Sequence, residues 1–565
     1  MCSTINMEGY TIMGYKMQAK QAPCMQACPV GIDVPRYVRL ISERKFAEAL
    51  TVICEKIPFP SVCGRVCFRP CEAKCHLYEL GGAVPVRALK RFVADRKEVG
   101  TAETITERTK NKVAIIGAGP AGLTAAYFLS RLAYRVIVFE SRSLAGGMMR
   151  WGIPAYRLPR NVLDAEIDVI KSAGVVVKTN TQVSSLDKLF SEGFNAIFVA
   201  SGTQSGIKMA IQGEDIPQVL DGVSLLERVN AGKVVKLGRR VCVVGGGNTA
   251  IDTARSARRL GAKKVTIIYR RSRDEMPASA EEVGEAIAEG VEVLFQAMPL
   301  KFMRKGRVVS MECVGTEPGG LDESGRRRFT AVKGSEFSLD CDVVIVAIGQ
   351  SAQMPDSFGL ALSQDGFISV DDETMATTRK GVFAGGDIVT GPASVIEAIA
   401  AGRKAASGID RYLGGTGNID ERLLPPEGEV RPLLSPLSVP VGVGSRKAIS
   451  LLPIEQRLAG FAETELPITE IVAVEQAERC LRCDLPIMVD EAKCVGCMTC
   501  QLRCSLRFEK ASQPSKAAIE VICTQGSDRV LAFQISLSDR CDACGLCVKY
   551  CPTGALTRQR VMKFG

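Results

Sequence analysis

The sequence predicts a multidomain α/β protein in which two parallel-sheet units lie between cysteine-rich modules. Three observations support this prediction. The length of 565 residues suggests three to five domains, at roughly 150 residues per domain. A pattern of strand, glycine turn, helix and strand occurs twice, at 112–140 and 240–271. The 22 cysteines are concentrated near the two ends of the chain, with eight between Cys2 and Cys75 and eleven between Cys480 and Cys551.

The first repeat carries the parts of a dinucleotide-binding unit. An apolar strand at 113–116 leads into the turn Gly117-Ala-Gly-Pro-Ala-Gly122, and a helix and a second strand follow, ending at Glu140. The first glycine makes the tight turn, the second lets the backbone approach a pyrophosphate, and the third permits close helix packing. The acid can accept a hydrogen bond from a ribose hydroxyl. The predicted binding residues are Gly117, Gly119, Pro120, Ala121, Gly122 and Glu140.

The second repeat ends in arginines instead of an acid. Its second strand is followed directly by Arg270 and Arg271, with Arg273 close behind. Guanidinium groups suit a 2′-phosphate, so the pattern favours NADP(H), although NAD(H) is possible. The alternative is that these arginines only solvate a strand end. The predicted binding residues are Gly245, Gly247, Asn248, Thr249, Ala250, Arg270 and Arg271.

Later segments predict how the two units are connected. The apolar strands at 197–202 and 343–349 would carry the chain between them. The strand at 382–384 and the small-residue helix at 393–406 would complete the first unit, with Asp387 facing the ribityl and pyrimidine side of a flavin. The second unit is therefore expected to be inserted in the first. The residues after 413, rich in Pro, Gly and Leu, are expected to form an extended return strap.

The C-terminal cysteines have the spacing of a bacterial two-cluster ferredoxin. Two C-x2-C-x2-C-x3-C runs begin at Cys494 and Cys541, and the second is followed by a proline. In this pattern the fourth cysteine of each run binds the cluster of the other run. Zinc is the alternative metal. One [4Fe–4S] cluster is therefore predicted on Cys494, Cys497, Cys500 and Cys551, and another on Cys541, Cys544, Cys547 and Cys504.

Several separate motifs carry a family resemblance. The segment Cys24-Met-Gln-Ala-Cys-Pro-Val-Gly-Ile-Asp33, the cysteine series at 63–75, the Gly-Ile-Pro segment at 146–159 and Tyr269-Arg-Arg-Ser-Arg-Asp-Glu-Met-Pro277 resemble the glutamate synthase small subunit. The same modules occur in dihydropyrimidine dehydrogenase and in the large subunit of the NADH-dependent ferredoxin:NADP oxidoreductase. The resemblance spans about 23–410. It implies an N-terminal α-helical domain with two [4Fe–4S] clusters, then FAD and NAD(P)H domains, with Gly147 among the FAD contacts.

The sequence departs from that family at one cysteine pair. Members carry an Arg-Cys-x2-Cys pair just before the position of Cys24, whereas this chain has the signature at Cys480 and Cys483. We therefore expect the return strap to bring this pair back to Cys24 and Cys75 as one cluster. Near Lys90 the family tends to have Glu or Gln as a cluster ligand, which a protonated lysine cannot replace. The second N-terminal cluster is therefore expected on Cys28, Cys63, Cys67 and Cys71.

The predicted fold class is thus α/β multidomain, with an α-helical iron–sulfur domain, two Rossmann-type domains and an α+β ferredoxin-like domain. The expected boundaries are 1–108 for the helical domain, 109–234 and 342–412 for the FAD domain, 235–341 for the NAD(P)H domain, 413–485 for the strap and 486–565 for the ferredoxin domain.

The net charge of +10 does not indicate a nucleic-acid partner. Four clusters and one FAD would each contribute roughly −2, so the loaded protein would be close to neutral. The sequence has no run of about 18 apolar residues, so no membrane span is expected. Residues 1–20 lack a signal-peptide pattern, and we predict a cytoplasmic location.

Together these features predict an electron-transfer subunit that moves electrons between NAD(P)H, FAD and four [4Fe–4S] clusters. The other end of the path would be a redox partner subunit or a ferredoxin, in a hetero-oligomer. The alternatives are a glutamate synthase small subunit, a flavin-bifurcating NAD(P)H:ferredoxin oxidoreductase and a non-catalytic iron–sulfur connector.

No catalytic side chain is expected, because hydride transfer to a flavin needs no acid or base from the protein. His76, the single histidine, is expected to lie beside a cluster ligand or on the surface. Trp151 is expected to pack. Glu281 and Glu282 are expected either near the nicotinamide or on a solvated helix face.

Overall fold

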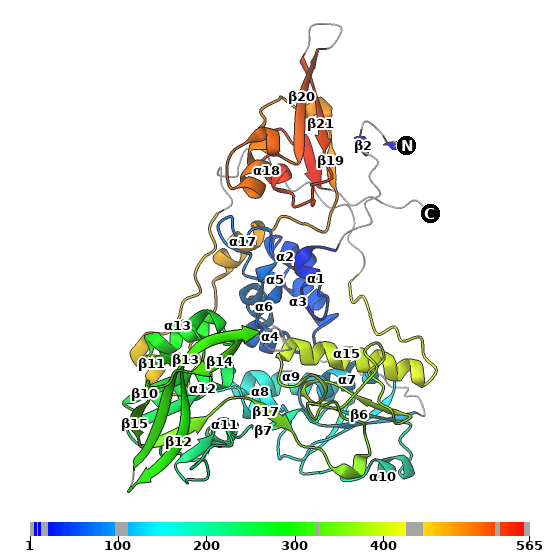
Figure 1. Ribbon diagram of the computed structural model, residues 1–565. Coiled ribbons are helices and arrows are strands. Elements are labelled where there is room, and N and C mark those ends of the chain that lie inside the picture. Colours follow the sequence, from blue (N-terminus) through cyan, green and yellow to red (C-terminus); the bar gives the residue numbers. More distant parts are fainter. Residues whose placement is uncertain are drawn as a thin grey trace.

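Two parallel five-stranded sheets form the base of the molecule, with the helical domain above them and the ferredoxin domain beyond it (Figure 1). The computed structural model describes residues 5–7, 10–12, 21–96, 111–306, 308–321, 327–424, 444–525 and 531–558. The predicted multidomain α/β fold class is confirmed. Among the described residues, no helix is long and apolar enough to cross a membrane.

The first sheet has the strand order β18-β6-β3-β4-β5, and all neighbouring strands are parallel. Its inner strands are nearly continuous apolar runs because helices cover both faces of such a sheet. The strands are β3 (Lys112–Ile116), β4 (Arg135–Phe139), β5 (Val176–Lys178), β6 (Ala196–Val199) and β18 (Val382–Ala384). Its helices are α7 (Pro120–Arg131), α8 (Met148–Trp151), α9 (Arg160–Ser172), α10 (Leu186–Ser191), α14 (Asp387–Thr390) and α15 (Val395–Tyr412).

The second sheet has the order β11-β10-β9-β16-β8 and extends past both ends of the expected domain at 235–341. The strand β16 lies between β9 and β8 and is parallel to both, so it belongs to this sheet and does not lead out of it. A short, wholly buried apolar strand fits either sheet, and only pairing distinguishes them. The elements are β8 (Val219–Asp221), α11 (Gly222–Asn230), β9 (Arg240–Val244), α12 (Asn248–Arg259), β10 (Lys264–Tyr269), α13 (Ala280–Ala288), β11 (Val291–Phe295) and β16 (Val343–Val346).

Two smaller sheets complete this half of the molecule. An antiparallel sheet follows β11 and contains β12 (Ala297–Lys305), β13 (Val308–Leu321), β14 (Arg327–Ala331) and β15 (Phe337–Cys341). The chain passes between the two parallel sheets through β7 (Thr203–Gly206) and β17 (Gln350–Ala352), which pair antiparallel. The second unit is thus inserted in the first, and β7 and β17 form the two-stranded connection.

The helical domain lies between the two parallel sheets and the ferredoxin domain (Figure 1). Its helices are α1 (Pro23–Gln26), α2 (Val34–Ser42), α3 (Phe46–Cys54), α4 (Pro60–Val66), α5 (Pro70–Ala73) and α6 (Val86–Ala94). Part of the expected strap, 425–443, lies outside the described residues. From residue 444 the strap forms α16 (Ile454–Leu458) and α17 (Glu470–Glu478), and α17 packs against α2.

The ferredoxin domain contains a hairpin, one longer helix and a small sheet. The hairpin consists of β20 (Ile519–Gln525) and β21 (Leu531–Leu537), and the helices are α18 (Thr499–Glu509) and α19 (Leu546–Lys549). The small sheet has the order β1-β2-β19-β22. Its strands β1 (Ile5–Met7) and β2 (Tyr10–Ile12) come from the region assigned by sequence to the helical domain. β2 pairs with β19 (Ile487–Val489), which pairs in turn with β22 (Leu556–Arg558).

Candidate nucleotide cavity and cysteine sets

A cavity of about 320 Å³ opens above the first glycine turn. Gly117 has a φ of +105°, and a Cβ there would lie 2.4 Å from the Ala200 carbonyl oxygen, so this turn requires glycine. A Cβ on Gly122 would lie 2.0 Å from the Gly117 oxygen, which explains its packing role. Seven of the eight residues predicted for FAD line the cavity, and only Gly122 does not: Gly117, Gly119, Pro120, Ala121, Glu140, Gly147 and Asp387.

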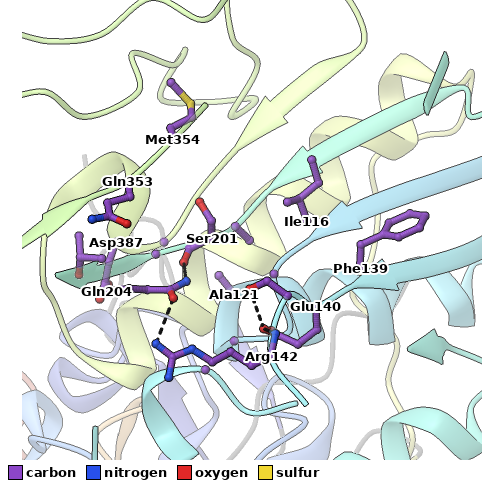
Figure 2. A pocket seen from close by; sticks show the side chains of 18 of the residues that line it. Ile116, Ala121, Phe139, Glu140, Arg142, Ser201, Gln204, Gln353, Met354 and Asp387 are labelled. Carbon is purple, nitrogen blue, oxygen red and sulfur yellow. Dashed lines mark hydrogen bonds between the residues drawn. The ribbon is translucent and has the colours of Figure 1, made fainter. Parts of the chain in front are cut away.

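Two carboxylates face this cavity from different elements (Figure 2). Glu140, at the end of β4, is 5% exposed and accepts hydrogen bonds from the backbone N–H groups of Ala118 and Arg142, both at 2.9 Å. Burial raises the pKa of Asp387 to about 6. Trp151 also lines the cavity, and its buried Nε1 has no acceptor among the described residues. A cavity with glycines in its wall, a carboxylate at the strand end and a buried unpaired donor fits a bound dinucleotide.

The second glycine turn has the same construction. Gly245 has a φ of +140°, and a Cβ there would lie 2.2 Å from the Ala347 oxygen, whereas a Cβ on Gly247 would meet open space. This turn leads into α12, whose first residues are Asn248, Thr249 and Ala250. Their backbone N–H groups lie at the helix N-terminus, where an anion is favoured. The predicted residues of this turn therefore lie together.

Gln350, which the sequence patterns did not single out, connects the two nucleotide sites. Its Oε1 accepts a hydrogen bond from Thr203, which lines the first cavity, at 3.1 Å. Its Nε2 donates to the Thr249 hydroxyl at the second site, at 3.4 Å. The two sites therefore face each other across β7 and β17. Gln350 reaches both sites only because β17 pairs with β7, and the sequence alone does not reveal this pairing.

The charged residues after β10 have distinct surroundings. The Arg271 guanidinium lies 5.1 Å from the centre of the Phe329 ring, whereas Arg270 is exposed. Glu281 forms an ion pair with Arg69 at 2.8 Å, and Glu282 forms one with Arg157 at 3.0 Å. These two acids therefore join domains and do not line the first cavity. The Glu281 side chain is 58% exposed, as on a solvated helix face, whereas Glu282 is half-buried.

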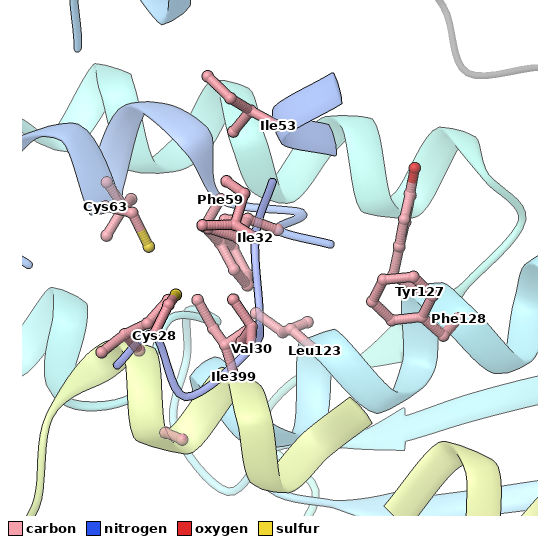
Figure 3. Packing of buried hydrophobic residues seen from close by; sticks show 14 of the residues in the cluster. Cys28, Val30, Ile32, Ile53, Phe59, Cys63, Leu123, Tyr127, Phe128 and Ile399 are labelled. Carbon is pink, nitrogen blue, oxygen red and sulfur yellow. The ribbon is translucent and has the colours of Figure 1, made fainter. Parts of the chain in front are cut away.

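Four cysteines of the helical domain surround Lys90, and we call them the inner set. Figure 3 shows Cys28 and Cys63 pointing into the same space. Burial raises the pKa of Cys63; Lys90 lowers it, and the neighbouring thiols of Cys67 and Cys28 raise it. The inner set consists of Cys28, Cys63, Cys67 and Cys71.

The strap set combines the two ends of the chain. One small apolar cavity is lined by all four of its sulfur-bearing residues together with His76. Burial raises the pKa of Cys24, and the thiols of Cys480 and Cys483 raise it further. The His76 Nδ1 lies 3.4 Å from the Cys483 sulfur, as expected of a histidine beside a ligand candidate. The strap set consists of Cys24, Cys75, Cys480 and Cys483.

The ferredoxin cysteines lie in two groups, and each group contains one cysteine of the other run. Burial raises the pKa of Cys500 to about 11, and its neighbouring thiols, including that of Cys551 from the other run, add to this. The Cys504 sulfur accepts a hydrogen bond from the Ala518 N–H at 3.2 Å and lies near Cys541. The near ferredoxin set is Cys504, Cys541, Cys544 and Cys547, and the far ferredoxin set is Cys494, Cys497, Cys500 and Cys551.

Protein-family models match three parts of the chain. The model described as pyridine nucleotide-disulphide oxidoreductase matches residues 111–402, which is more than half of the chain. This chain belongs to that family. The model described as dihydropyrimidine dehydrogenase domain II, 4Fe-4S cluster, matches this oxidoreductase at 16–101, and the 4Fe-4S binding domain model matches it at 537–557.

Three curated relatives are similar over most of the oxidoreductase. It is 41% identical to the NADP(+)-dependent formate dehydrogenase subunit beta of Moorella thermoacetica, over 82% of this chain and 70% of that one. It is 37% identical to the NADPH-Fe(3+) oxidoreductase subunit beta of Geobacter sulfurreducens, over 82% and 75%. It is 36% identical to the glutamate synthase [NADPH] small chain of Escherichia coli, over 69% and 88%.

These findings confirm the resemblance derived from the motifs. The chain is an FAD-dependent NAD(P)H oxidoreductase with iron–sulfur domains, and electron transfer is its function. The number of clusters, the cysteines that hold them and the partner stay predictions.

Proposed function

We propose that this oxidoreductase carries electrons between NADPH and a redox partner subunit by way of FAD and four [4Fe–4S] clusters, one on each cysteine set. When bound, FAD would exchange hydride with the nicotinamide and electrons, one at a time, with the clusters. The observation that carries the proposal is that the four sets form an unbroken row from the flavin cavity to the far end of the ferredoxin domain.

The row begins beside the flavin cavity. Ala121 on α7 and Ala398 on α15 line that cavity. Leu123 and Ile399, their near neighbours on the same helices, pack in one apolar cluster with Cys28 and Cys63 of the inner set (Figure 3). One layer of helix therefore separates the cavity from the inner set.

The inner set leads to the strap set through Cys71, whose thiol is among the neighbours that raise the pKa of Cys24. The strap set leads to the ferredoxin domain, because the Cys483 sulfur lies 3.5 Å from the Cys544 carbonyl oxygen and within hydrogen-bonding distance of it. His76 strengthens this junction: its Nε2 lies 3.3 Å from Asp542 of the ferredoxin domain. The two ferredoxin sets meet where Cys500 approaches Cys547.

The comparisons support a partner without identifying it. Two relatives are named as beta subunits and one as a small chain. The same relatives carry NADP(H) in their names, which supports NADP(H) as the nicotinamide cofactor of this chain. The cytoplasmic location stays a prediction.

The proposal is tested by breaking the row at the strap set. Anaerobically purified wild type is expected to hold about 16 iron and one FAD, at four iron per cluster. A C480S/C483S double variant is expected to hold about 12 iron. After mixing with NADPH its flavin should still bleach, while the electron paramagnetic resonance signals of the ferredoxin clusters should no longer appear.

The matched control is C523S, because Cys523 is exposed on β20 and belongs to none of the four sets. It should keep about 16 iron and full cluster reduction. If C480S/C483S kept about 16 iron and its ferredoxin clusters were reduced as fast as in the wild type, the strap set would hold no cluster and would not carry electrons.

A further inference from the structure

Lys90 is a buried cation enclosed by the inner set. It lies on α6 and is 3% exposed. Its ammonium lies close enough to the thiols of Cys67, Cys63, Cys71 and Cys28 to interact electrostatically with each of them. All four members of the inner set therefore face one lysine.

The other cations of this helix have different partners. Arg87 pairs with Glu465 at 2.5 Å, and Arg91 pairs with Asp95 at 3.2 Å and with Glu463 at 3.0 Å. Lys90 lies between them in sequence, yet no carboxylate among the described residues forms an ion pair with it. The arginines of this helix are thus neutralised by acids of the strap and by the C-cap Asp95, whereas the largest charge interactions of Lys90 are with the thiols of the inner set.

A buried ammonium without an anion costs several kcal/mol of folding free energy. The neutral thiols of an unloaded site do not offset this cost, whereas four thiolates around an iron–sulfur core carry net negative charge. One-electron reduction adds a further negative charge to the core and changes no bond and no proton. A cation at close range in a low-dielectric interior therefore stabilises the reduced core more than the oxidised one.

We propose that Lys90 is the counter-ion of the cluster on the inner set and raises its reduction potential above the value that the four thiolates alone would give. The cluster next to the flavin cavity would then be a favourable acceptor of single electrons. This inference rests on the assignment of a cluster to the inner set under the proposed function. Lys90 would not bind iron; its positive charge would act on the cluster through space.

The test is a potentiometric titration of the full chain, followed by electron paramagnetic resonance, with dithionite and mediators in place of NADPH. In K90M, which has a side chain of similar length and no charge, one cluster should become harder to reduce by about tenfold or more in its equilibrium constant, or 59 mV for one electron. In K90R, which keeps the charge, the shift should be less than half as large. The control K188M removes the same charge from an exposed lysine on α10, away from the cysteine sets, where water screens it, and should shift no cluster.

Each outcome decides the question. Unchanged potentials in K90M overturn the proposal. Loss of about four iron from K90M but not from K90R supports it, because only the charge distinguishes the two outcomes. Loss of iron from both shows that the shape of the lysine matters and not its charge, which overturns it. The titration uses dithionite and not NADPH, so its result does not depend on the nicotinamide site. If NADPH failed to reduce the wild type in a separate experiment, that would contradict the proposed function but not the role of Lys90.

Discussion

Replacement of Arg271 by alanine is expected to remove most of the preference for NADPH over NADH that we propose for this oxidoreductase. The Arg271 side chain is half-buried and lies against the Phe329 ring of β14, 5.1 Å from its centre, so the guanidinium is held in place. Arg270 is exposed. A held and partly desolvated guanidinium makes stronger hydrogen bonds to a phosphate than one that solvent surrounds.

The expected magnitudes differ accordingly. A hydrogen bond to a charged group contributes about 1.5–3 kcal/mol, and about 1.4 kcal/mol corresponds to a tenfold change in affinity. R271A should therefore weaken NADPH binding by about 10- to 100-fold. R270A should weaken it by less than about fivefold, because exposed ion pairs contribute about 0–1 kcal/mol. Neither change should affect NADH, which has no 2′-phosphate.

The assay is anaerobic stopped-flow measurement of flavin bleaching at a series of NADPH and NADH concentrations. F329L, which removes the ring and keeps both arginines, should reproduce part of the R271A effect. R304A, an exposed arginine on β12 of the same domain, should leave the ratio of the two affinities unchanged. A wild type that prefers NADH, or an R271A variant with an unchanged ratio, would mean that the arginines only solvate a strand end.

Two further predictions concern the flavin cavity. E140A should lower the FAD content per chain, read from flavin absorbance. The variant removes the charged acceptor of two buried N–H groups, and each of these hydrogen bonds contributes about 1.5–3 kcal/mol. Equal FAD content in E140A and in the exposed control E421A would contradict this prediction. Burial raises the pKa of Asp387 from 3.8 to about 6, so the stability that its protonated form gives the FAD-free protein is present below about pH 4 and lost as the pH rises through about 6. D387N should flatten the pH dependence of the unfolding midpoint between those values, and an unaltered slope would refute the assignment.

The nucleotide units could be predicted from sequence because their determinants are local. A strand, three glycines and a helix start follow one another within a dozen residues, and Gly117 and Gly245 adopt the positive φ that such turns require. The interleaving of the ferredoxin cysteines was predictable for the same reason. The domain boundary at 341/342 was not, because the apolar strand β16 fits either parallel sheet until its partners are known.

The residues that connect the sites could not be predicted, because they depend on the packing of segments far apart in the chain. Gln350 joins the two nucleotide sites only because β17 pairs with β7. From the sequence, Lys90 could be recognised only as a residue that cannot replace a cluster ligand, and a role for its charge appears only when the four cysteines of the inner set lie around it. In both cases the role of the residue depends on contacts in the folded structure and not on any pattern in the sequence.

The strap set joins the assembly of this protein to its conduction path. Two of its cysteines precede the nucleotide-binding domains in the chain and two follow them. The strap is also fixed by protein contacts: Arg479 donates to the Gly81 carbonyl at 3.0 Å, and the Arg446 N–H donates to the same carbonyl at 2.7 Å. Because Cys483 also contacts Cys544, the residues that attach the ferredoxin domain are those that would pass electrons to it. A chain in which this junction fails to form would lose a contact between the two domains and the step of the electron path that crosses it together.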